Sequence, residues 1–220
     1  MVIWKYKIRR MIRNEKVSVI LADGFEEIEA LTVVDLLRRA QIYVGTVSAT
    51  DEYIVHGAHG INVQTEDLFE EVNFVESDMI VLPGGMPGTT NLNDHAGVRR
   101  VVKDFYEEGK YVAAICAAPT VLANLGILKG KRITCFPTVE NQIQGAVITR
   151  MPATVDGNII TGRGAGTAID FALKLIDALS GPDKRVRLQR LSFISKKMKN
   201  DGKSGLFPKN RGGYLRLFVL

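Results

Sequence analysis

Short apolar runs alternate with segments of helical periodicity through residues 17–180 of this chain. The apolar runs are too short for helices and are typical of buried parallel strands; they include Val17–Ala22, Asp78–Leu82 and Tyr111–Ile115. Between and after them, apolar residues recur at helical spacing, as in Thr167–Leu179, which Gly181-Pro182 is predicted to end. This alternation predicts a single α/β domain with a doubly wound, mostly parallel sheet and helices on both faces.

The first helical segment follows Asp23-Gly24 and is expected to extend to Ala40. Asp23 is predicted to be its N-cap, with Glu26 at capping-box spacing. Its apolar residues are expected to face the sheet because they recur at three-residue steps, at Ile28, Leu31, Val34 and Leu37. The later segment Tyr53–Val63 is rich in glycine and histidine and is predicted to form a turn or hairpin.

Charge divides the 220 residues into three parts. Residues 1–16 have six Lys/Arg and one acid, and residues 181–220 have eleven Lys/Arg and two acids, whereas the stretch between has twelve basic and twenty-one acidic residues. We therefore predict a basic N-terminal extension (1–16), a domain (17–181) and a basic C-terminal tail (182–220). Solvated, partly disordered ends are expected, and contact of the basic ends with nucleic acid is the alternative. Within the tail, Arg185–Lys199 has the pattern of a basic amphipathic helix.

The chain has no apolar run near the roughly 20 residues that a membrane-spanning helix needs. The N-terminal stretch Met1–Lys16 is basic but lacks the apolar core of a signal peptide. With only two cysteines, these features predict a cytoplasmic protein with free thiols and no membrane contact.

Cys116 stands between a predicted strand and a predicted helix, in Ala-Ala-Ile-Cys-Ala-Ala-Pro-Thr at 113–120. Small neighbours suit a sharp strand-to-helix turn, which would present the thiol at the carboxyl end of the sheet, where α/β folds bind ligands. The positive end of the helix dipole favours the thiolate. The plain alternative is a buried cysteine that acts as a small apolar residue.

Two further features are placed to assist a thiolate at this edge. Gly84 and Gly85 follow the strand Asp78–Leu82, and their backbone N–H groups can approach a developing oxyanion closely, although Pro-Gly-Gly is also an ordinary turn. Glu29 is flanked by Ile28 and Ala30, so its carboxyl is expected to point inward over the end of the sheet. Burial there would raise its pKa and suit it to proton transfer at neutral pH.

Together these motifs resemble the ThiJ/PfpI superfamily, in the branch of the Parkinson-disease-associated deglycase and its YajL-like relatives. The matching segments are Gly-Phe-Glu-Glu-Ile-Glu-Ala at 24–30, Leu-Pro-Gly-Gly at 82–85, the Cys116 elbow, and Gly-Thr-Ala-Ile-Asp-Phe at 166–171. The resemblance implies a flavodoxin-like sheet, a homodimer, a reactive Cys116 and a Glu29 carboxyl hydrogen-bonded to it. It also implies an oxyanion site formed by the N–H groups of Gly85 and Ala117.

The departures from the family pattern concern histidine. Ala117 stands where the peptidase branch has its histidine, so a peptidase is disfavoured. Phe136 stands where some deglycase relatives have another histidine. No histidine follows His95, so an amidotransferase, which needs a late histidine, is disfavoured as well. By the resemblance, His59 and Arg39 correspond to the rim of the partner's active site in a dimer, where His59 would donate a proton; a plain surface histidine is the alternative. His56 and His59 lack an evident third ligand, so no metal site is expected.

The expected function is that of a cofactor-free cysteine enzyme, like a glyoxalase III or a protein deglycase, acting on small α-oxoaldehydes or glycated adducts. The alternative is a redox-sensing stress protein or chaperone that signals through oxidation of Cys116. Both readings use the same residues, so the sequence alone does not separate them.

Overall fold

The main sheet of the computed structural model has seven strands, and the description covers residues 15–192 and residue 194. From one edge to the other, the order is β10 (Ala153–Asp156), β11 (Ile159–Gly162), β7 (Tyr111–Ile115), β6 (Met79–Leu82), β1 (Lys16–Leu21), β2 (Tyr43–Ser48) and β5 (Asp67–Leu68). All neighbours are parallel except β10 and β11. The chain runs outward from β1 to β2 and then returns to β6 on the other side of β1, so the predicted doubly wound sheet is confirmed.

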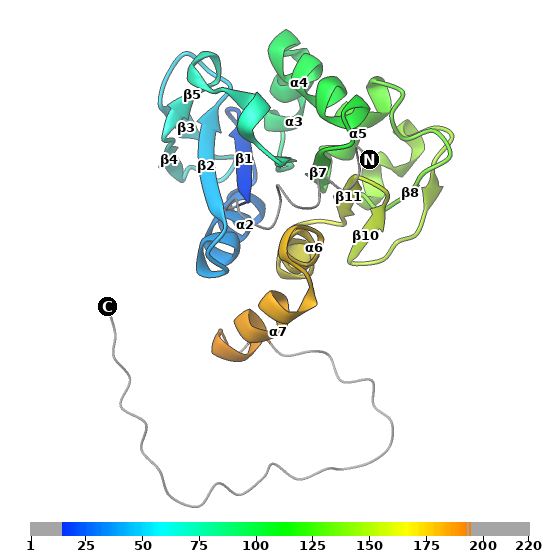
Figure 1. Ribbon diagram of the computed structural model, residues 1–220. Helices are drawn as coiled ribbons and strands as arrows, with labels where there is room; N and C mark the ends of the chain where they lie inside the picture. Colours follow the sequence, from blue (N-terminus) through cyan, green and yellow to red (C-terminus); the bar gives the residue numbers. More distant parts are fainter. Residues whose placement is uncertain (1–14, 193, 195–220) are drawn as a thin grey trace, which may run out of the picture.

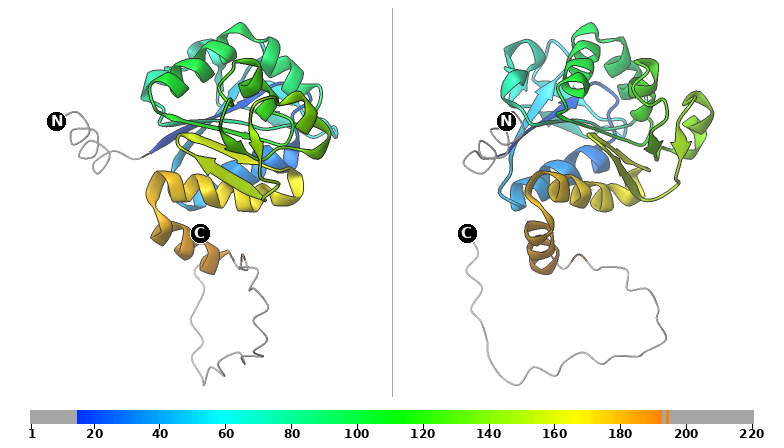
Figure 2. Two further views of the ribbon diagram at one scale, coloured as in Figure 1. Left: turned by 90° about the vertical axis from the view of Figure 1, so that its right-hand side faces the viewer. Right: turned by 45° about the vertical axis from the view of Figure 1, so that its right-hand side comes forward.

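Helices cover both faces of this sheet (Figures 1 and 2). One face packs against α2 (Glu27–Arg39) and α6 (Ala168–Ser180), which lie side by side. The other face is covered by α3 (Gly88–Asp94), α4 (Ala96–Glu107) and α5 (Pro119–Asn124). Successive strand residues point to opposite faces and therefore contribute to two core clusters, one on each side.

Short elements lie outside the main sheet. The predicted hairpin is confirmed as β3 (Ile54–His56) paired antiparallel with β4 (Asn62–Gln64). A second small sheet pairs β8 (Arg132–Ile133) with β9 (Val147–Ile148) in parallel. The described 3₁₀ helices are η1 (Phe69–Glu71), η2 (Phe74–Glu76), η3 (Pro137–Gln142) and η4 (Ala165–Thr167).

The start of α2 differs from the prediction that Asp23 caps it. Glu26 is the N-cap, and its Oε2 accepts a hydrogen bond from the Glu29 N–H at 2.7 Å. Asp23 is committed elsewhere, because its Oδ1 accepts the backbone N–H of His56 at 2.8 Å and also contacts the ring. Tertiary contact with the hairpin therefore moves the cap by three residues.

The buried face of α2 also differs from the predicted one. Val34 and Leu37 are buried as expected, but Ile28 and Leu31 are 57% and 39% exposed. The helix instead turns toward the core a stripe that includes Glu27, Glu29, Ala30, Val33 and Leu36. This rotation brings two carboxyl groups inward at the start of the helix.

The C-terminal boundary of the packed structure lies beyond residue 181. Gly181 ends α6 with φ of 82°, and Pro182 begins α7 (Pro182–Leu191) in the first helical turn, where its missing N–H costs nothing. Leu188 is 4% exposed in the core cluster of α2 and α6, and Arg185 pairs with Asp177 at 2.6 Å. The predicted basic helix thus starts three residues early, and its predicted end, 195–199, lies outside the described residues.

Among the described residues, no helix is both long enough and apolar enough to cross a membrane. Residues 1–14 of the predicted basic extension (1–16), and residues 193 and 195–220 of the predicted tail (182–220), lie outside those residues. Lys16, the last residue of that extension, is instead the first residue of β1. The expected contact of the basic ends with nucleic acid stays a prediction.

Candidate active site

Cys116 occupies a sharp elbow where β7 ends and the approach to α5 begins. Its backbone has φ of 65°, in the left-handed region that residues other than glycine rarely adopt. Two main-chain hydrogen bonds hold it there: its N–H donates to Gly162 O at 3.0 Å, and Phe136 N–H donates to its carbonyl at 2.8 Å. Strand β11 on one side and the chain after β8 on the other therefore fix the elbow. The side chain is half-buried at the carboxyl end of the sheet.

Glu29 reaches this elbow from α2 and is fully buried. Its Oε2 accepts the Gly84 N–H at 2.8 Å, and contact with the Cys116 thiol lowers the pKa of the carboxyl. Its other oxygen, Oε1, receives no N–H or O–H donor from the part of the chain that the structure describes. The buried carboxyl is therefore left with capacity to take up or give a proton beside the sulfur.

The glycine pair after β6 fits between these two side chains. A Cβ on Gly84 would lie 2.6 Å from the Cys116 Cβ and 2.7 Å from Glu29 Oε2, so no larger residue fits without separating them. Gly85 has φ of 93°, a conformation that glycine adopts freely. The backbone N–H groups of Gly85 and Ala117 lower the pKa of the Cys116 thiol, so they act on this sulfur. These are the two donors expected to stabilise an oxyanion.

Burial dominates the electrostatics of the pair. It raises the pKa of Glu29 to about 7; contacts with Cys116 and the Gly84 N–H act against this rise, and the charge of Glu26 adds to it. Burial also raises the pKa of the Cys116 thiol, as do the charge and hydrogen bond of Glu29, whereas the Ala117 and Gly85 N–H groups lower it. The helix dipole alone therefore does not give the expected thiolate. The proton stays on sulfur beside an ionised Glu29 until the carboxylate accepts it.

This buried carboxyl predicts a pH-dependent cost to stability. The pKa of Glu29 in the folded protein, about 7, exceeds its ordinary value of 4.5. The folded state therefore holds the Glu29 proton more tightly than the unfolded state does. This contribution to the free energy of unfolding is fully present below pH 4.5 and is lost as the pH rises through 7. Glu29→Gln, which cannot ionise, should therefore gain stability relative to wild type between pH 5 and 8, by up to roughly 3 kcal/mol. Urea unfolding of both proteins across this range measures the difference. A difference that does not grow with pH would contradict the prediction.

The two predicted rim residues have partners within the chain. The His59 ring nitrogen Nδ1 lies 2.8 Å from Glu27 Oε2, and Arg39 Nε donates to Asp35 Oδ2 at 2.7 Å. Their expected role at a partner's active site stays a prediction. The other histidines are also engaged: His56 contacts Asp23, and the His95 ring caps α4 by accepting the Val98 N–H. The elbow thus has a carboxyl partner and no histidine dyad.

Sequence reasoning missed the roles of Glu27 and Gly164 near the site. The Glu27 side chain is only 4% exposed and holds the β3–β4 loop, although its position in a first helical turn suggests a solvated charge. Gly164 borders the sulfur: a Cβ on it would lie 3.9 Å from Cys116 Sγ and 3.2 Å from the ring of Phe136. No periodic signal marks Gly164, because it comes from an irregular segment that the sheet brings to the elbow.

Comparison with known proteins agrees with this geometry. A model described as the DJ-1/PfpI family matches residues 15–178. Protein dj-1beta of Drosophila melanogaster is 36% identical over 173 residues, covering 78% of this chain and 92% of its own length. A protein of Pyrococcus abyssi named as a deglycase is 34% identical over 154 residues, 69% of this chain and 91% of the relative.

The chain spans 40% of the length of protein DJ-1 homolog B of Arabidopsis thaliana, to which it is 33% identical over 177 residues, or 80% of this chain. The solved structure of oxidised Toxoplasma gondii DJ-1 superposes with a TM-score of 0.78 at 35% identity, covering 81% of this chain and 98% of that one. The residues that the family model matches run from the start of β1 into α6 and include the cysteine elbow.

Proposed function

This chain belongs to the DJ-1/PfpI family, and from that premise we propose that it is a cofactor-free cysteine enzyme acting on reactive α-oxoaldehydes or their early adducts. The observation that carries the proposal is the contact between the Cys116 thiol and the buried Glu29 carboxyl, whose pKa burial raises to about 7. A group with this pKa is suited to exchange protons at neutral pH. The relative named as a deglycase supports the same class of chemistry.

The first step is attack of sulfur on the aldehyde carbon of a substrate such as methylglyoxal. Glu29 takes the thiol proton as the S–C bond forms, and the carbonyl π electrons move to oxygen, where the Gly85 and Ala117 N–H groups stabilise the negative charge. Return of the proton to that oxygen gives a neutral hemithioacetal. No redox partner is needed in this step.

The second stage moves hydrogen within the adduct. Glu29, again a carboxylate, removes the proton from the former aldehyde carbon while the ketone oxygen takes up a proton, which gives an enediol. Glu29 then returns its proton to the former ketone carbon, and the hydroxyl on the sulfur-bearing carbon loses its proton to become the thioester carbonyl. The product is a thioester of a 2-hydroxy acid, and water hydrolyses it to lactate and free Cys116. For a glycated adduct, the Cys116 sulfur would displace the amine or thiol from the carbon that bears it, and Glu29 would return the thiol proton to the departing group.

Peptide hydrolysis fits this site less well. A leaving amine needs a strong general acid, which a Cys–His arrangement supplies and which a shared Cys–Glu proton supplies poorly. All three histidines of the chain have other partners. Addition to an aldehyde expels no amine, so it does not require a strong general acid from Cys116 and Glu29.

The direct test is lactate formation from methylglyoxal by the purified full-length chain, measured by a coupled dehydrogenase assay beside Cys116→Ser. Turnover that depends on Cys116 supports the enzyme proposal. A rate no faster than that of the Cys116→Ser protein would overturn it.

The second candidate function is redox sensing, and the similarity to a DJ-1 protein of Toxoplasma gondii solved in an oxidised form favours keeping it. Cys116 is half-buried, with Glu29 and the Gly85 and Ala117 N–H groups acting on its sulfur. A protonated Glu29 would donate a hydrogen bond to a sulfinate there and stabilise it. Treatment with hydrogen peroxide should then add two oxygen atoms at Cys116 by mass spectrometry before Cys135 reacts. Equal oxidation of the fully buried Cys135 would argue against this candidate.

We also propose a homodimer that joins through α2 and α6. Ile28, Leu31 and Ile169 are 57%, 39% and 46% exposed on these adjacent helices, an apolar group that a second copy would cover. Ile28→Asp is expected to convert a dimer to a monomer at micromolar concentration, because two like charges would meet near a two-fold axis. Light scattering coupled to size-exclusion chromatography measures the mass; an unchanged dimer, or a wild-type monomer, would refute this interface.

A further inference from the structure

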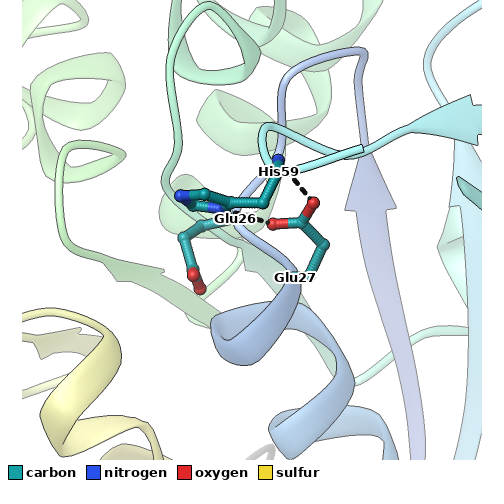
Figure 3. Close-up of side chains that lie close together, drawn as sticks. All are labelled: Glu26, Glu27 and His59. Atoms are coloured by element: carbon teal, nitrogen blue, oxygen red, sulfur yellow. Dashed lines mark hydrogen bonds and ion pairs between the residues drawn. The ribbon is translucent and has the colours of Figure 1, made fainter. Parts of the chain in front are cut away.

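Three metal-ligating side chains lie close together beside the start of α2 (Figure 3). Glu26 and Glu27 come from the N-terminus of α2, and His59 comes from the loop between β3 and β4. One carboxylate oxygen from each glutamate and a ring nitrogen of His59 all lie within 4.8 Å of one another. The third ligand that the histidine spacing alone did not reveal is thus supplied by the helix.

The backbone holds this cluster in place. Glu27 Oε1 accepts the His59 N–H at 2.6 Å and the Ile61 N–H at 3.4 Å, so its buried carboxylate is oriented by the loop. Gly57 lets the loop approach, because a Cβ there would collide with the Glu27 side chain. The His59 side chain is 69% exposed, so a solvated ion has direct access to the ligands.

Charge in this cluster is not balanced by the protein. Glu26 and Glu27 form no ion pair with any lysine or arginine of the described chain, and their only basic neighbour is His59. Glu27 is buried, where a charge is costly unless it is paired, and the His59 ring at 2.8 Å is the one basic group against two carboxylates. This combination distinguishes the cluster from the exposed acidic groups of an ordinary helix N-terminus.

We propose that Glu26, Glu27 and His59 bind a divalent cation, with Zn²⁺ as the best match to one imidazole and two carboxylates. The ion takes the place of the proton between His59 Nδ1 and Glu27 Oε2, which leaves for solvent. Ligand atoms about 2.1 Å from a tetrahedral ion lie roughly 3.4 Å apart, so the present 2.8 Å contact needs only a small opening. Water completes the coordination. The ligands include neither Cys116 nor Glu29, so the site stands whether or not the proposed function holds.

The test is titration of the full-length, metal-free protein with Zn²⁺ by calorimetry, and with Co²⁺ by visible ligand-field absorption. Wild type should bind one ion. Even outer-shell partners change metal affinity by about 10- to 100-fold, so loss of a direct ligand in His59→Ala or Glu26→Gln should weaken binding by about 100-fold. Glu26→Gln keeps an oxygen for the N-cap, and thermal unfolding verifies that both variants are folded.

Two matched variants sharpen the result. His56→Ala removes the other histidine of the hairpin, whose ring faces the single carboxylate of Asp23, and should bind Zn²⁺ like wild type. Cys116→Ser removes the competing soft ligand and should also bind like wild type. Absence of binding by wild type, equal loss in His56→Ala, or loss in Cys116→Ser would each overturn the proposed site.

Discussion

Replacing Cys116 by serine is expected to reduce lactate formation from methylglyoxal by about 10³-fold or more, since removal of a catalytic nucleophile commonly has effects of this size or larger. The serine hydroxyl has a far higher pKa than a thiol, and Glu29, with a pKa of about 7, is too weak a base to activate it. The shape of the elbow should be kept, because serine has nearly the volume of cysteine. Initial rates with matched protein concentrations measure the loss.

The second cysteine provides the control. Cys135 is fully buried in the core cluster on the opposite face of the sheet from Glu29, and burial raises the pKa of its thiol to about 11. Cys135→Ala should therefore leave the rate per folded molecule within about twofold of wild type. If Cys135→Ala abolished turnover while Cys116→Ser kept it, the nucleophile would have been assigned to the wrong residue.

Glu29→Gln is expected to reduce kcat/KM by about 10²- to 10⁴-fold, the usual contribution of a positioned acid–base group. Glutamine can still accept the Gly84 N–H, so the geometry of the elbow should survive. In wild type, the carboxylate is the active form in the first step, and kcat/KM should therefore rise with pH and level off above about 7, following the pKa of Glu29. The residual activity of the variant should show no such inflection.

Substitution of Glu26 tests how its negative charge affects Glu29 without removing the Glu29 carboxyl itself. The negative charge of Glu26 raises the pKa of Glu29, so Glu26→Gln should move the inflection to lower pH and retain turnover within about tenfold of wild type. An inflection that persists in Glu29→Gln would assign the titration to another group. An inflection that moves upward in Glu26→Gln would contradict the sign of the interaction.

The sequence is sufficient for the parts of the fold that local pattern determines. Strand Tyr111–Ile115 and the hairpin at Tyr53–Val63 follow from apolar runs and glycine positions, and both are present. Sequence patterns fail where a distant segment competes for a side chain. Asp23 has the properties of an N-cap, but its carboxylate accepts a hydrogen bond from the hairpin residue His56, 33 residues away. A rule based on neighbouring residues does not predict that contact.

The same limit applies to the site. The position of Glu29 near Cys116 follows from its apolar neighbours and from family resemblance, whereas the burial of Glu27 depends on a loop that approaches through Gly57. Ile28 and Leu31 satisfy a helical apolar pattern and are nevertheless exposed, because the periodicity of α2 fits more than one orientation on the sheet. Which orientation is chosen depends on packing against α6, which the helix sequence does not encode by itself.

The left-handed backbone at Cys116 also limits the evolutionary choices open to this position. A β-branched residue is a severe outlier at positive φ. The backbone conformation of the elbow therefore excludes threonine, although threonine is a nucleophile in other enzymes. Serine is a single substitution away from cysteine and keeps a nucleophilic side chain. Glycine relieves the backbone strain but removes the nucleophile. Descendants of this fold that abandon cysteine should therefore carry serine, glycine or asparagine here, and their activities should diverge accordingly.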